Sequence, residues 1–170
     1  MRTVIDCCRH LPFDEALAVA DSALQDVDVS LADLMDAAHS SPRTGRSRVL
    51  RVLSHADPGS ANSFESALRA LCIEAGLEVE AQGDIGGVGV CDIVDRRRML
   101  AIEGESFAYH GSEKAFEKDV RRYTAFGRRG WLVIRFTVND VLTNPSYVSR
   151  VLSDVMACRP VVSARRLARA

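Results

Sequence analysis

The stretch GVGVCDIVDRRRMLAIEGES, residues 87–106, decides the fold predicted for this chain. It contains two strand-like segments, GVGVCDIVD and MLAIEGES, which the polar turn DRRR joins. Asp92 interrupts an otherwise apolar run in the first segment, and Glu103 interrupts the second. If the two strands pair through the turn, Asp92 and Glu103 become neighbours.

The pleat of a strand predicts which of these side chains share a face, because alternate residues point the same way. On the second strand this groups Ala101 with Glu103 and Glu105, the two glutamates lying about 7 Å apart. On the first strand one face is expected to carry Val88, Val90, Asp92 and Val94. Carboxylates at close range raise each other's pKa unless a cation lies between them, and such oxygen clusters suit Mg²⁺ or Mn²⁺. The alternative is a solvent-facing acidic pair at an exposed strand end.

Elements on both sides of this stretch complete a mixed α/β pattern. SFESALRALCIEAGL, residues 63–77, predicts an amphipathic helix that ends at Gly76, and EVEAQGDI, residues 78–85, predicts a strand. Residues 112–130 predict a helix, and WLVIRFTV, residues 131–138, predicts a buried central strand. Residues 139–159 form a closing helical region, broken near Pro145. We therefore expect an α/β (α+β) fold, with a mixed central sheet, helices on its faces and an αβββαβ core.

The part before residue 55 predicts helices. Pro12 lies near one helix start, and Ser30 with Asp33 forms a capping-box pattern at another. DPGSANS, residues 57–63, is the clearest linker. The expected organisation is thus a helical N-terminal segment, residues 1–58, followed by a domain at residues 59–170.

Composition excludes few classes of protein. The chain has 170 residues and a formal net charge of −1, so any nucleic-acid surface must come from local charge. Five cysteines without a CxxC spacing predict reduced, mostly buried thiols in a cytosol rather than a zinc site. The N-terminus does not fit a signal peptide, and no apolar run approaches the ~20 residues of a membrane span. A cytoplasmic protein is expected.

The order of motifs resembles the PD-(D/E)XK nuclease superfamily, and most closely its very-short-patch-repair-like (Vsr-like) branch. The matching motifs are CDIVD, IEGESFAYH, KDVRRYTAFGRRGW and WLVIRFT. FESALR and AQGDI are also similar to motifs in the nuclease-like C-terminal domains of actinobacterial AbiEi-related proteins. The resemblance covers about residues 63–155. It implies a restriction-endonuclease-like fold and metal-dependent hydrolysis of DNA phosphodiester bonds.

The same resemblance implies roles for single residues. Asp92 and Glu103 would hold Mg²⁺ or Mn²⁺, and Glu65 would add an acid from its helix. Gln82 would join this constellation, and His110 would act as the base. Glu105 stands where the superfamily usually has a lysine, and in this branch an acid is common there. The plainer interpretations are a first-turn helix acid for Glu65, a strand-surface residue for Gln82 and a loop histidine for His110.

Basic residues in the turn and on the following helix predict a surface that contacts DNA phosphates. They are Arg96, Arg97, Arg98, Lys114, Lys118, Arg121 and Arg122. The alternatives are a solvated face for the arginines and a helix-surface ion pair between Asp119 and Arg122. The leading hypothesis is a metal-dependent DNA endonuclease. The competing one is a catalytically inactive nuclease-fold module that binds DNA or acts as a toxin–antitoxin or regulatory protein. A protein partner or a homodimer is compatible with either.

Overall fold

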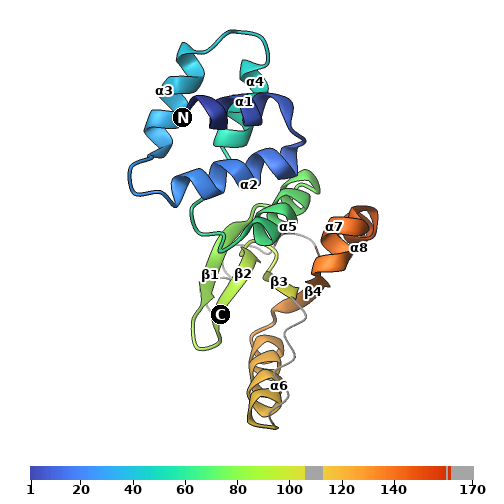
Figure 1. The fold of residues 1–170 in the computed structure, drawn as a ribbon. Coiled ribbons are helices and arrows are strands. Elements are labelled where there is room, and N and C mark those ends of the chain that lie inside the picture. Colours follow the sequence, from blue (N-terminus) through green and yellow to red (C-terminus); the bar gives the residue numbers. More distant parts are fainter. Residues whose placement is uncertain (106–112, 160, 162–170) are drawn as a thin grey trace. The chain divides into compact units, whose positions relative to one another are not determined.

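A computed structural model of the chain describes residues 1–105, 113–159 and 161. Its backbone divides into two compact units, Met1–Ala70 and Leu71–Ala170, so that the helix at residues 63–74 begins in one unit and ends in the other. Figure 1 shows the elements in chain order, with the helices of the first unit coloured from blue through cyan to green. None of the helices in the described part of the chain combines the length and apolar character that a membrane crossing requires.

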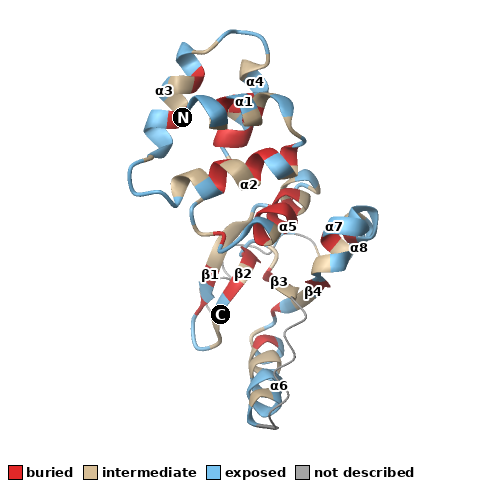
Figure 2. Ribbon diagram, in the orientation of Figure 1, coloured by how far each residue is buried: buried red, intermediate tan, exposed pale blue. Residues whose placement is uncertain are grey.

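The first unit is helical, as predicted. It contains α1 (Arg2–His10), α2 (Phe13–Leu24), α3 (Leu31–Ser40), α4 (Arg46–Leu53) and the start of α5 (Ser63–Glu74). The capping box at Ser30 and Asp33 is confirmed, since the serine hydroxyl accepts from the Asp33 N–H and the Asp33 carboxylate accepts from the Ser30 N–H. The buried apolar side chains of α1, α2, α3 and α4 form the interior of this unit (Figure 2).

A buried ion pair also lies in this unit. Arg69 Nη2 donates to both carboxylate oxygens of Asp21, at 2.8 and 2.7 Å. The Asp21 side chain is 1% exposed and that of Arg69 is 3% exposed. Ser66 Oγ and the Asp57 N–H also donate to Asp21, so α2, the linker and α5 meet at one carboxylate. The linker is therefore held by hydrogen bonds as well as by its turns.

The second unit is built on a four-stranded mixed sheet with the strand order β1-β2-β3-β4. The strands are β1 (Glu80–Ile85), β2 (Gly89–Asp95), β3 (Leu100–Glu105) and β4 (Leu132–Thr137). β1 with β2 and β2 with β3 are antiparallel, whereas β3 and β4 are parallel and joined through α6 (Glu113–Arg128). The predicted hairpin through DRRR is confirmed by the pairs Ile93↔Ile102 and Asp95↔Leu100. The protein is therefore mixed α/β, with helices flanking a mixed sheet.

Helices lie on both faces of this sheet. Phe126 of α6 and Trp131 share one apolar cluster with Val94 and Ala101. Phe136 of β4 meets Tyr147 of α8 (Pro145–Cys158) edge to face, with the ring centroids 6.3 Å apart. The helical region after β4 is indeed interrupted, because α7 (Val138–Thr143) ends just before α8 begins at Pro145.

Two expectations about the strands are wrong. WLVIRFTV is not a central strand: β4 lies at the sheet edge, and Leu132 and Arg135 are exposed. An apolar run shows that a strand has buried positions but not how many neighbours it has. β2 also departs from the regular pleat that was predicted. Residues three positions apart in a regular strand point to opposite faces, but Cys91 and Val94 belong to the same core cluster. The ladder with β3 stops at Ile93↔Ile102, and beyond it Gly104 N–H donates to the Asp92 side chain at 2.9 Å.

The five cysteines carry free thiols, as predicted. Cys8, Cys72 and Cys91 are buried, whereas Cys158 is exposed. Burial raises the pKa of the Cys8 and Cys91 thiols to about 11, so both are protonated near neutral pH.

Candidate functional site

Glu103 of β3 is the centre of the candidate site. It is 4% exposed, which is rare for a carboxylate unless it is paired. Tyr123 of α6 donates its hydroxyl to Glu103 Oε2 at 2.7 Å. The other oxygen, Oε1, is buried and accepts no hydrogen bond from any residue that the structure describes. A buried carboxylate is costly unless a positive charge lies beside it, and Oε1 is the atom that this charge must contact.

Arg122, the neighbour of Tyr123 on α6, supplies the nearest positive charge. Its Nη2 lies 2.6 Å from Glu103 Oε1, an ion-pair distance, but the approach does not have hydrogen-bond geometry. The same nitrogen donates to the backbone carbonyl of Val90 at 2.6 Å and lies 3.8 Å from Cys91 Sγ. Arg122 therefore points inward to β2 and β3 rather than pairing with Asp119 on the helix surface.

A second guanidinium comes from β4. In the parallel ladder Arg135 lies opposite Glu103 and next to Glu105, two residues further along β3. Arg135 Nε donates to Glu105 Oε1 at 2.7 Å, and Nη2 contacts the same oxygen. The guanidinium carbon also lies 4.8 Å from the centroid of the Tyr123 ring. Burial acts to lower the pKa of Arg135, but the hydrogen bond and the charge of Glu105 outweigh it, so the pKa is raised.

Asp92 and Gln82 occupy the irregular point of the sheet. They lie between the pairs Ala81↔Ile93 and Gly83↔Cys91, which places them at one level of the β1–β2 ladder. Gln82 has a backbone φ of 48°, a left-handed conformation that costs a non-glycine residue about 1 kcal/mol or more. Because Asp92 accepts the N–H of Gly104, its carboxylate lies beside the peptide that follows Glu103.

These residues suit a divalent cation in part. Asp92 and Glu103 carry the hard oxygen atoms that such ions prefer, although Arg122 Nη2 lies 2.6 Å from Glu103 Oε1. The site contains three carboxylates and two guanidinium groups, so that its net charge is negative. These groups belong to Asp92, Glu103, Glu105, Arg122 and Arg135. However, residues 1–105, 113–159 and 161 contain no group of three histidine, cysteine or acidic side chains placed to hold a metal. Asp92 and Glu103 therefore stay the predicted ligands, on neighbouring strands β2 and β3.

Glu65 belongs to the first unit, where its carboxylate accepts from the Ala61 N–H at 2.9 Å and from the Asn62 side-chain amide at 2.9 Å. These contacts are those of an acid at a helix start, the plainer interpretation given above. His110 lies outside the described residues.

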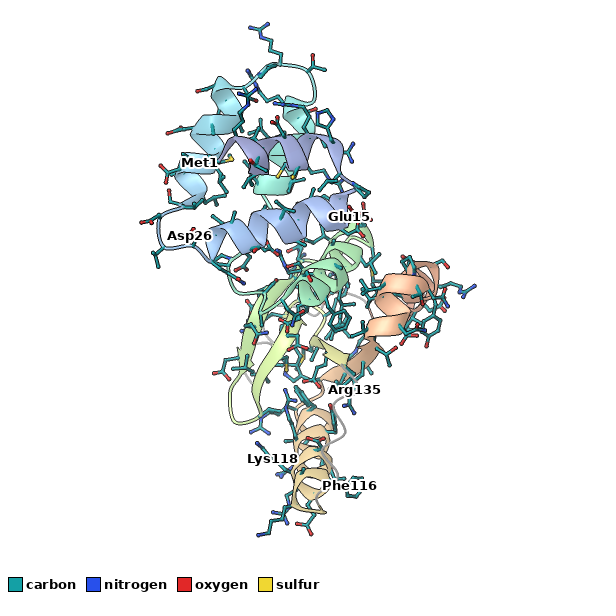
Figure 3. The ribbon with its side chains drawn as sticks, in the orientation of Figure 1. Met1, Glu15, Asp26, Phe116, Lys118 and Arg135 are labelled. Atoms are coloured by element: carbon teal, nitrogen blue, oxygen red, sulfur yellow. The ribbon has the colours of Figure 1, made fainter. Side chains whose placement is uncertain are left out.

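The basic residues predicted to contact DNA fall into two groups. In the turn, Arg96 pairs with Glu80, Arg97 with Glu78, and Arg98 with the fully buried Asp95 at 2.9 Å. On α6, Lys114, Lys118 and Arg121 are exposed, and Arg121 pairs with Glu117 at 3.3 Å. Figure 3 shows Arg135 where β4 meets α6 and Lys118 further along that helix. Both groups reach the surface, since the side chains of Arg96 and Arg97 are 46% and 51% exposed.

Tyr123 and Arg135 are members of this cluster that the sequence analysis missed. Arg135 had a recognisable signal, because it interrupts the apolar run WLVIRFTV just as Asp92 interrupts CDIVD. Tyr123 had none, since a tyrosine on an amphipathic helix is ordinary. Only the packing of α6 on the sheet reveals that its hydroxyl reaches Glu103.

We expect replacement of Tyr123 by phenylalanine to destabilise the protein by about 1.5 kcal/mol, because a hydrogen bond to a charged acceptor is lost. Burial, followed by the hydrogen bond to Glu103 and its charge, raises the pKa of the Tyr123 phenol above its unfolded value of about 10. The stabilisation is therefore complete below about pH 10 and is lost as the pH rises further. Urea unfolding at about pH 8 and about pH 11 should show a larger difference between the two proteins at the lower pH. An equal difference at both pH values would contradict this linkage.

Comparison with known proteins adds relatives without an assigned function. "Uncharacterized protein MT2308" of Mycobacterium tuberculosis (strain CDC 1551 / Oshkosh) is 28% identical to this chain over 149 residues, and "Uncharacterized protein Rv2248" of strain ATCC 25618 / H37Rv gives the same values. The alignment covers 84% of this chain and 55% of each relative, so the chain spans about half the length of the curated relatives it matches. No protein-family model matches the chain, and no solved structure matches it significantly.

Proposed function

We propose that this protein is a metal-dependent DNA endonuclease, with a restriction-endonuclease-like fold and its active site at Asp92 and Glu103. The observation that carries the proposal is the pairing of β2 with β3, which puts Asp92 and the buried carboxylate of Glu103 on neighbouring strands. A buried carboxylate needs a counter-charge, which Arg122 supplies in this structure and which a bound cation would supply in its place. The order of motifs in the sequence supports the same conclusion.

In this proposal Asp92 and Glu103 hold Mg²⁺ or Mn²⁺. When bound, the ion would lower the pKa of a water molecule and offset charge on the phosphate oxygens. Tyr123 keeps Glu103 in one orientation by donating to Oε2, and the Gly104 N–H does the same for Asp92. His110 takes the proton of the attacking water, whose oxygen bonds to phosphorus while the bond to the leaving oxygen breaks. Lys118 and Arg121, on the exposed face of α6, contact the DNA backbone.

Another candidate function is a catalytically inactive nuclease-fold module. The ion pairs favour it, because Arg122 already lies beside Glu103 and Arg135 holds Glu105. In that case the two guanidinium groups take the place of a metal as the counter-charge, and the protein binds DNA or a regulatory partner without cutting. A cation that enters the site of an active enzyme must compete with Arg122.

A plasmid-nicking assay in Mn²⁺ separates these functions. We expect the wild-type protein to convert supercoiled plasmid to the nicked or linear form, and Asp92→Ala to lose this activity roughly 100-fold or more, because one of two metal ligands is removed. Asp154→Ala, an exposed acid on α8, is the matched control and should cut like the wild type. A pure wild-type protein that binds DNA and leaves it uncut would favour the inactive module instead.

A further inference from the structure

β3 contains no lysine or arginine, but a guanidinium group from the neighbouring strand β4 lies beside its last residue. Glu105, the last residue of β3, is acidic and would by itself repel a phosphate. However, Arg135 of β4 pairs with Glu103 in the parallel ladder. Its Nε donates to Glu105, and its Nη2 contacts the same carboxylate. A positive charge from β4 therefore lies beside the carboxylates of β3.

Arg135 is held on two sides. Glu105 fixes the edge of the guanidinium, and the ring of Tyr123 lies against its face, 4.8 Å from the guanidinium carbon to the ring centroid. Tyr123 is itself fixed to Glu103 through its hydroxyl. A planar guanidinium that is stacked and hydrogen-bonded loses little conformational entropy when it binds a further acceptor. Arg135 is thus pre-oriented beside the buried carboxylate.

Arg135 also remains accessible. Its side chain is 44% exposed, and that of Glu105 is 38% exposed, whereas Glu103 is buried. Arg122, the other guanidinium of the site, is less exposed, at 26%, and points to Glu103 and the Val90 carbonyl. The two arginines therefore differ: Arg122 balances the charge of Glu103, and Arg135 faces both the site and the solvent.

We propose that Arg135 binds a phosphate of the DNA substrate at this site and stabilises the charge that develops on it. A guanidinium group suits this task, since its paired N–H groups match two phosphate oxygens and its charge is permanent. Glu105 and Tyr123 act as positioning residues for Arg135. The inference rests on the proposed endonuclease function for the reaction, but phosphate binding by Arg135 does not require a bound metal.

The first test measures binding without a divalent cation. A fluorescently labelled DNA duplex is titrated with wild type, Arg135→Gln and Arg135→Lys in EDTA over a series of salt concentrations. Loss of one phosphate contact should reduce the slope of log K against log salt by about 0.9 in Arg135→Gln. Arg135→Lys keeps the charge and should keep the slope, with a modest loss of affinity. Arg150→Gln, an exposed arginine on α8, is the control and should match the wild type. Circular dichroism verifies that each variant is folded.

The second test measures cleavage in Mn²⁺. Arg135→Gln should cut roughly 100-fold more slowly than the wild type, as expected when one preorganised group that stabilises the transition state is removed. The double variant Glu105→Lys/Arg135→Gln places a cation on β3 instead, and should recover part of the lost rate. A merely structural role for Arg135 predicts no such recovery.

The outcomes separate the two proposals. A folded Arg135→Gln protein with the wild-type salt slope and rate overturns the inference about Arg135, while the endonuclease proposal stands. A wild-type protein that never cuts, but whose salt slope depends on Arg135, overturns the endonuclease proposal and supports the phosphate site. A wild-type protein that does not bind the duplex at all overturns both.

Discussion

Replacing Glu103 by glutamine is expected to abolish metal-dependent DNA cleavage, with a loss of roughly 100-fold or more. Glutamine has nearly the same shape and still offers an oxygen to the Tyr123 hydroxyl, so the packing of β3 against α6 is preserved. What disappears is the negative charge on Oε1, the buried atom that the proposed cation would contact. The substitution therefore removes the charge of Glu103 and its ion pair with Arg122, while it spares the contact with Tyr123.

Two measurements verify this prediction. Plasmid nicking in Mn²⁺ gives the loss of activity, and thermal unfolding with and without Mn²⁺ gives the loss of binding. A ligand that binds only the folded protein raises its stability, so wild type should show a Mn²⁺-dependent increase in Tm that the variant lacks. Glu117→Gln makes the same chemical change on the exposed face of α6 and should behave like the wild type in both assays. Undiminished cleavage by the Glu103→Gln protein would place the active site elsewhere.

Replacing Asp21 by alanine is expected to destabilise the protein by about 3–5 kcal/mol, a large part of the stability of a typical domain. Asp21 accepts from Arg69, Ser66 and the Asp57 N–H, and it is almost completely buried. Without it the guanidinium of Arg69 stays buried with no carboxylate partner in the described structure. Leaving one charge of a buried pair uncompensated costs far more than the pair itself contributes.

Urea unfolding of three variants makes this argument quantitative. Asp21→Ala should show the full loss, whereas Asp21→Ala combined with Arg69→Met should be less destabilised, because no unpaired charge remains. Asp36→Ala removes an exposed aspartate of α3 in the same unit and should change the free energy of unfolding by less than about 0.5 kcal/mol. A loss below about 1 kcal/mol for Asp21→Ala would show that the pair is not the constraint that its burial indicates.

Much of the fold follows from local signals. The helix start at Ser30, the interruption near Pro145, the end of α5 near Gly76 and the β2–β3 hairpin were all predicted, because each depends on residues that are close in the sequence. Hydrophobic periodicity and turn residues are sufficient for such elements. The position of β4 was not predictable in this way, since a strand at a sheet edge and a central strand have similar apolar runs.

The candidate site likewise has one part that the sequence predicts and one part that depends on tertiary packing. The sequence by itself determined that the strands of Asp92 and Glu103 are neighbours, because the two strands of a short hairpin lie close together in the chain. Only the tertiary structure decided what surrounds them. Arg122, Tyr123 and Arg135 reach Glu103 and Glu105 because α6 packs on the sheet and β4 adds to it in parallel, and these contacts join residues up to 32 positions apart. No local pattern encodes such contacts, since they arise from the packing of whole elements rather than from the spacing of residues within one.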